Sequence, residues 1–93
     1  MITKDGNRYR VQGPMIMDNA RSILEEGTSL FNHDAVEVDL AGVDEVDSSA
    51  ISILLQWLRE AQHRNQGLTF INLPENLKSL VTLYGVLELI PQE

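Results

Sequence analysis

Residues 38–50 read VDLAGVDEVDSSA, and the change of pattern inside this stretch decides the fold. Over residues 36–40 apolar residues alternate with acidic ones, which predicts a strand with one buried face. Residues 41–47 then predict a loop. Ser48 or Ser49 is expected to cap the helix that follows, because a hydroxyl at this position accepts hydrogen bonds from free backbone N–H groups.

The helix that follows is the strongest in the chain, and Gly67 is expected to end it. Its apolar residues recur at helical spacing in two neighbouring stripes, so a wide arc of the helix should be buried. The stripe that we expect to pack into the core contains Ile51, Leu54, Leu55 and Leu58. The second stripe contains Ala50, Ile53, Trp57 and Ala61. The position of Trp57 favours a place in the core over a place in an interface.

Upstream of this stretch the pattern predicts two strands and a helix. Residues 8–12 alternate, which predicts a short half-exposed strand, and residues 15–17 predict a second one after a Gly-Pro interruption. Asp18 fits the N-cap of a helix whose apolar residues recur as far as Phe31.

Downstream, residues 68–73 predict a strand, and Pro74 opens a last helix that Gly85 ends. Residues 86–90 are apolar and predict either a final strand or a docked tail. The order is therefore β-β-α-β-α-β-α-(β). It predicts an α/β fold with a central mixed sheet packed by about three helices.

Length and composition restrict the class of protein. With 93 residues we expect a single domain over residues 1–93, with its ordered core at about residues 8–90. The net charge of −7 argues against nucleic acid and bare anionic membrane as ligands. The absence of cysteine excludes disulfides, thiolate zinc sites and cysteine nucleophiles. No signal peptide or membrane-spanning segment is recognised, so a cytoplasmic location without direct membrane insertion is expected.

Residues 38–50 resemble the core of STAS domains, in which a strand ending in Asp-Leu is followed by a short loop and by Asp-Ser-Ser at the start of a long apolar helix. The similarity covers nearly the whole chain, since the order of elements also agrees. The family includes anti-sigma-factor antagonists, sulfate-transporter tails and a bacterial lipid-transport subunit. The resemblance implies a single STAS domain that binds a partner protein, catalyses no reaction and needs no cofactor.

The C-terminal part looks like the MlaB branch of the family, the STAS subunits of the Mla phospholipid ABC transporter of Gram-negative bacteria. The residues that carry this likeness are LKSLVTLYGV at 77–86 and LIP at 89–91. The likeness implies a subunit that binds the cytoplasmic ATPase, supports its assembly or activity in maintaining outer-membrane lipid asymmetry, and reaches the inner membrane through this complex. MlaB usually has a threonine where this chain has Ser48, and the family's glycine two positions further on is Ala50.

The alternative is an anti-sigma-factor antagonist, in which the serine matching Ser48 is phosphorylated and the partner is a serine-kinase anti-sigma factor. A phosphate at a helix N-terminus is favoured by the free N–H groups and the helix dipole, and its charge would repel an acidic partner surface. From its position alone, Ser48 is better explained as a simple helix cap, and it is the family resemblance that favours a role facing the partner. The residues predicted to bind a partner or to be phosphorylated are Asp47, Ser48 and Ser49. The further interface candidates are Asp44, Glu45, Ala50 and Ser52.

Two other kinds of site are less well supported by the sequence. Asp39, Asp44, Glu45 and Asp47 form an acidic cluster with the oxygen ligands that Mg²⁺ prefers, but a solvated loop explains them as well, and no metal site is predicted. A hydrolase would need an imidazole base near Ser48. His63 lies fifteen residues further along the helix, which is roughly 20 Å away at 1.5 Å per residue.

Overall fold

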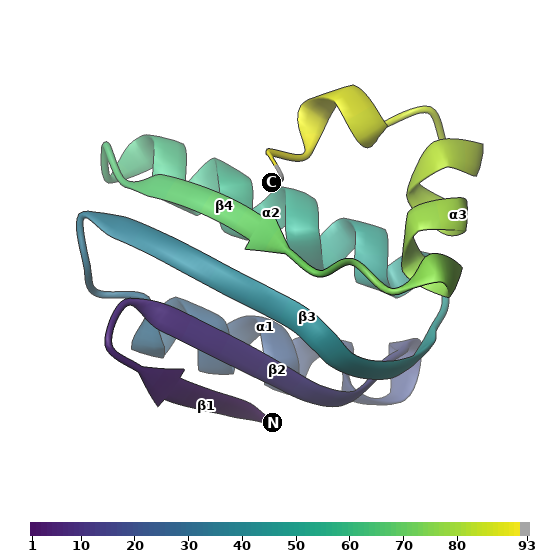
Figure 1. The fold of residues 1–93 in the computed structure, drawn as a ribbon, viewed down its shortest axis with the longest axis horizontal. Coiled ribbons are helices and arrows are strands. Elements are labelled where there is room, and N and C mark those ends of the chain that lie inside the picture. Colours follow the sequence, from purple (N-terminus) through teal and green to yellow (C-terminus); the bar gives the residue numbers. More distant parts are fainter. Residues whose placement is uncertain (92–93) are drawn as a thin grey trace.

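The computed structural model describes residues 1–91 and places them in one layered α/β unit (Figure 1). The strands are β1 (Ile2–Asp5), β2 (Arg8–Met15), β3 (Ala35–Val46) and β4 (Gly67–Ile71). The helices are α1 (Ala20–Leu30), α2 (Ser48–His63) and α3 (Glu75–Leu83), with the short 3-10 helices η1 (Met17–Asn19) and η2 (Leu87–Leu89). The strands lie in the order β1-β2-β3-β4. Because β1–β2 is antiparallel and the other two pairs are parallel, the sheet is mixed, which confirms the predicted fold class.

The first two strands differ in position from the prediction. β2 is continuous from Arg8 to Met15, so the separate strand predicted at residues 15–17 is wrong. The antiparallel partner of β2 is β1, which precedes the residues where the core was expected to begin. β1 is an edge strand in which Ile2 alone is buried, and so its sequence shows no alternation from which a strand could be predicted.

Strand β3 also continues where a loop was predicted. The sequence predicts a loop there because two bulges interrupt the alternation of side chains along the strand. From Arg10 to Gln12 the chain of β2 advances two residues, while its partner β3 advances three, from Asp39 to Gly42. A second shift of the same kind follows nearer the end of both strands. Each extra residue turns the following side chains to the opposite face, so the period of two is lost over residues 41–46.

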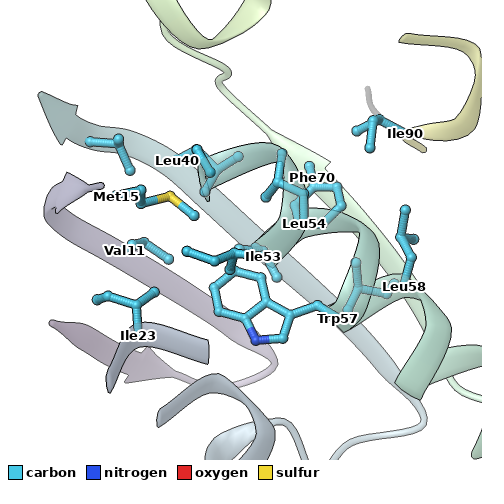
Figure 2. Packing of buried hydrophobic residues seen from close by; sticks show 14 of the residues in the cluster. Val11, Met15, Ile23, Leu40, Ile53, Leu54, Trp57, Leu58, Phe70 and Ile90 are labelled. Carbon is cyan, nitrogen blue, oxygen red and sulfur yellow. The ribbon is translucent and has the colours of Figure 1, made fainter. Parts of the chain in front are cut away.

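Helices α1 and α2 lie on the same face of the sheet, behind it in Figure 1. Their contact centres on Trp57, which is 1% exposed and donates a hydrogen bond from Nε1 to the Leu24 carbonyl oxygen at 3.1 Å. The indole lies against Gly27, where a Cβ atom would come within 2.6 Å of the ring. The predicted core position of Trp57 is therefore confirmed (Figure 2).

The predicted apolar stripe of α2 is confirmed at three of its four positions. Ile51, Leu54 and Leu58 are buried, and Leu54 is fully so. Leu55 is only partly buried, because it lies at the edge of the buried arc beside a shallow hollow that the exposed Leu89 also lines. The expectation that Leu55 is a core residue was therefore too strong.

The C-terminal segment is a docked tail and not a fifth strand. After α3 the chain forms η2 and returns to the outer edge of β4, where the Phe70 N–H donates a hydrogen bond to the Pro91 carbonyl oxygen at 2.8 Å (Figure 1). Ile90 is 3% exposed and belongs to the core cluster. Of the two predicted alternatives for this segment, the structure confirms the docked tail.

Candidate functional site

The N-terminus of α2 is capped by Asp47, so the prediction that Ser48 or Ser49 caps this helix is wrong. Asp47 is the extended residue before the first helical turn, and its Oδ1 accepts a hydrogen bond from the Ser49 N–H at 2.8 Å. A carboxylate at this position reaches the free N–H groups of the first turn directly. Ser48 is consequently the first helical residue, not the cap.

Asp47 also holds a second segment in place. Its Oδ2 accepts a hydrogen bond from the Met17 N–H at 2.9 Å, so one carboxylate joins the start of η1 to the start of α2 across thirty residues of sequence. This bond is the main reason that the pKa of Asp47 is lowered, and the bonds from Ser49 add to it against the opposing effect of desolvation. Asp47 is therefore a positioning residue that keeps its charge.

The Ser48 side chain does not take part in capping α2. Its side chain is exposed, and within residues 1–91 no hydrogen bond is made by its hydroxyl. Ser52 lies one turn further along the same face of α2 and is also exposed, whereas Ser49 is partly buried. Ser48 and Ser52 thus present two hydroxyls on an exposed face of α2, and neither hydroxyl forms a hydrogen bond within residues 1–91.

The residues around Ser48 add charge and one large apolar side chain. Asp44 and Glu45, near the end of β3, are both exposed, and Asn76 Nδ2 at the start of α3 donates to the Asp44 carbonyl oxygen at 3.5 Å. Met17 is 74% exposed although its backbone is tied to Asp47. We call Met17, Asp44, Glu45, Ser48 and Ser52 the α2-start surface.

Sequence reasoning missed Met17 and misplaced Ala50. Met17 was assigned to a short strand, and its local pattern gives no sign that it faces solvent. Ala50 was expected at the interface, but it is completely buried in the core, so its side chain is not accessible to a partner. The physical reason is that it lies on the same arc of α2 as Trp57, which is seven residues away.

The predicted acidic cluster, Asp39, Asp44, Glu45 and Asp47, does not form a metal site in the part of the chain that the structure describes. Within residues 1–91, no group of three or more His, Cys, Asp or Glu side chains has an arrangement that could hold a metal ion. Asp39 is 5% exposed, and its Oδ1 accepts hydrogen bonds from the Ala41 N–H at 3.0 Å and Asn72 Nδ2 at 3.2 Å. Asp39 therefore fixes the backbone within the first bulge of β3 and ties it to Asn72, the residue that follows β4.

Neither histidine is placed to serve Ser48 as a base. His63 is the last residue of α2, so the whole helix separates it from Ser48. His33 lies in the loop before β3, whereas Ser48 follows the end of that strand.

Among residues 1–91, none of the helices combines the length and the hydropathy that crossing a bilayer requires.

Solved structures with the same fold were found at low sequence identity. A putative anti-sigma factor antagonist from Thermotoga maritima has a TM-score of 0.78 at 9% identity, with 99% of this chain and 83% of that chain covered. An anti-sigma factor antagonist from Mycobacterium paratuberculosis has a TM-score of 0.78 at 17% identity, with 99% and 81% covered. A sulfate transporter family protein from Wolinella succinogenes has a TM-score of 0.72 at 14% identity, with 95% and 75% covered.

These likenesses concern the fold, and the family assignment comes from the sequence. A search of curated proteins found no match. The family model described as "Mlab, STAS domain" matches residues 2–91, which is nearly the whole chain and includes the strand, the Asp-Ser-Ser turn and the long helix that carry the α2-start surface. The chain therefore belongs to the STAS domain family, in the group whose model is described by that name.

Proposed function

We propose that this chain is a non-catalytic subunit of a bacterial phospholipid ABC transporter, where it binds the cytoplasmic ATPase subunit through the α2-start surface and supports its assembly or activity. STAS domains typically bind protein partners, and the family model that matches is the one described by the name Mlab. On this proposal the chain lies at the cytoplasmic side of the inner membrane through its complex.

The observation that carries the proposal is that Asp47 caps α2 and leaves the Ser48 side chain exposed. Asp47 caps α2 and holds the Met17 N–H. The exposed Ser48 hydroxyl and the exposed Met17 side chain therefore belong to backbone segments that the Asp47 carboxylate holds together by hydrogen bonds. Preorganised groups lose little conformational freedom on binding, and a large apolar side chain beside polar groups is typical of interface anchors. The acidic residues Asp44 and Glu45 then favour a partner surface that carries Lys or Arg.

Affinity capture from a Gram-negative host tests this proposal. The tagged wild-type chain should retain an ABC ATPase subunit, and Ser48→Asp should lose it. Ser29→Asp is the matched control, because Ser29 is also an exposed helical serine but lies near the other end of α1, away from the Asp47–Met17 bond. Capture of the ATPase by Ser48→Asp as strongly as by the wild type would overturn the assignment of the surface.

A second function is favoured by the accessibility of the Ser48 hydroxyl. If the chain is an anti-sigma-factor antagonist, a serine kinase would phosphorylate Ser48, where the helix N-terminus tolerates a phosphate. The same capture experiment separates the two functions. Retention of a serine kinase of the anti-sigma type, with a phosphate found on Ser48 by mass spectrometry, would move the function to this class.

A further inference from the structure

Helix α3 ends in a leucine and a tyrosine that the core does not use. Leu83 is 78% exposed and Tyr84 is 54% exposed. The other side of the helix is packed, since Leu77 and Val81 are fully buried. Single apolar residues are common on protein surfaces, so exposure alone assigns no role to Leu83.

The turn after Leu83 is held on both sides. The Val86 N–H donates a hydrogen bond to the Val81 carbonyl oxygen at 3.2 Å, and Gly85 has a φ of 71°, as glycine commonly has just past the end of a helix. Val81 is fully buried, and Val86 and Leu87 pack against the core cluster. Since the backbone around Leu83 has little freedom left to lose, this side chain can serve as an anchor at a low entropic cost.

Leu83 lies on the side of α3 that continues from the α2-start surface. Asn76, at the beginning of α3, donates from Nδ2 to the carbonyl oxygen of Asp44, which belongs to that surface, at 3.5 Å. Leu83 follows Asn76 by about two helical turns, so both side chains leave α3 on the same side, about 10 Å apart along its axis. In Figure 1, α3 stands beside the end of β3. A partner that covers Asp44 is therefore within reach of Leu83.

The charges along this path indicate the chemistry of the partner. Asp44, Glu45 and Glu75 are exposed acids, and Lys78 is an exposed base. Glu75, Lys78 and Leu83 are among the residues that line a shallow hollow of about 470 Å³ on the outer face of α3. Three acids and one base leave a net negative charge beside an exposed apolar side chain. This combination favours a partner whose apolar pocket is flanked by Lys or Arg.

We propose that Leu83, with Tyr84 beside it, is the apolar anchor of the interface with the ATPase subunit, so that the docking surface runs from the α2-start surface along α3. This role rests on the proposed function, because the anchor belongs to the same interface. The ATPase subunit supplies an apolar pocket for Leu83 and basic side chains near Asp44 and Glu75. Because most of the Leu83 side chain is exposed in the free chain, its burial contributes to binding and not to folding.

Affinity titrations of the full chain against the ATPase subunit test the anchor. Leu83→Ala should weaken binding at least about tenfold, and its thermal melt should match that of the wild type. Leu89→Ala is the matched control, because Leu89 is also an exposed leucine but lines a different hollow, beside Leu55 of α2. The control should bind within about twofold of the wild type. An equal loss of affinity in both variants would reject the anchor.

A pair of charged substitutions tests the chemistry of the pocket. Leu83→Lys should weaken binding more than Leu83→Glu, because both place a charge in an apolar pocket but only the lysine is repelled by flanking Lys or Arg side chains. The reverse order, or wild-type affinity in Leu83→Ala, would overturn the anchor while leaving the proposed function in place. Failure of the wild-type chain itself to bind the ATPase subunit would instead overturn the proposed function, and the anchor with it.

Discussion

A change at Ser48 should affect folding very little, because Asp47 already caps α2. We expect Ser48→Asp to change the free energy of unfolding by less than about 1 kcal/mol, since a helix N-terminus tolerates a carboxylate. If Ser48 lies in the interface, the same change should weaken partner binding by about two orders of magnitude or more, because a new charge is buried without a counter-charge. A thermal melt and an affinity titration on the same variant check both expectations. Normal folding with normal affinity would show that Ser48 lies outside the interface.

Asp47 predicts a dependence of stability on pH. Because the pKa of Asp47 is lowered in the folded protein, its contribution is fully present above the unfolded value of about 3.9 and is lost as the pH falls through the folded pKa. Asp47→Asn keeps one acceptor oxygen and so loses one of the two hydrogen bonds. The wild type should therefore be more stable than Asp47→Asn above about pH 5, and the difference should shrink below about pH 4. Denaturant melts across this range measure it, and a difference that grows toward acid would contradict the account.

At the scale of the element, α2 should respond very differently to two adjacent truncations. Leu54 is fully buried, so Leu54→Ala should lower the free energy of unfolding by about 2–5 kcal/mol, as core leucine truncations do. Leu55 is partly buried, and Leu55→Ala should cost clearly less. Urea titrations of the two variants give the comparison. Equal losses would mean that the buried arc of the helix is centred between the two positions.

The elements that the sequence predicts best are those whose side chains keep one period. Residues 36–40 and the apolar arc of α2 are long enough for the period to show, and both are where they were expected. Period reasoning failed at β1, which buries only Ile2, and at residues 41–46, where bulges change the face of each following residue. At the site, the Asp-Ser-Ser turn was located correctly, but the capping residue was misassigned by one or two positions. Sequence spacing does not show which of three consecutive polar side chains turns toward the free N–H groups.

At the scale of the whole molecule, the negative charge should govern the rate of association with a basic partner. The chain has 14 acidic and 7 basic residues, and two of the acidic ones, Asp44 and Glu45, lie in the α2-start surface. We expect the association rate constant to fall at least about tenfold as ionic strength rises from about 0.1 M to about 1 M, because the Debye length shrinks from about 10 Å to about 3 Å.

Stopped-flow measurements with the ATPase subunit would record this salt dependence. The double change Asp44→Asn and Glu45→Gln should flatten it more than Glu88→Gln, which removes an exposed charge on η2. A rate constant that does not respond to salt would mean that steering by charge has no part in the encounter.

The packing of Trp57 against Gly27 has a practical consequence for spectroscopy. This indole is the only one in the chain, and it is shielded from water between α1 and α2. Its fluorescence therefore comes from one place, and emission should shift to longer wavelength when α1 separates from α2 and water reaches the ring. A fluorescence-detected folding trace of this protein follows the docking of α1 on α2, so the growth of the sheet has to be followed by a probe of backbone structure such as circular dichroism.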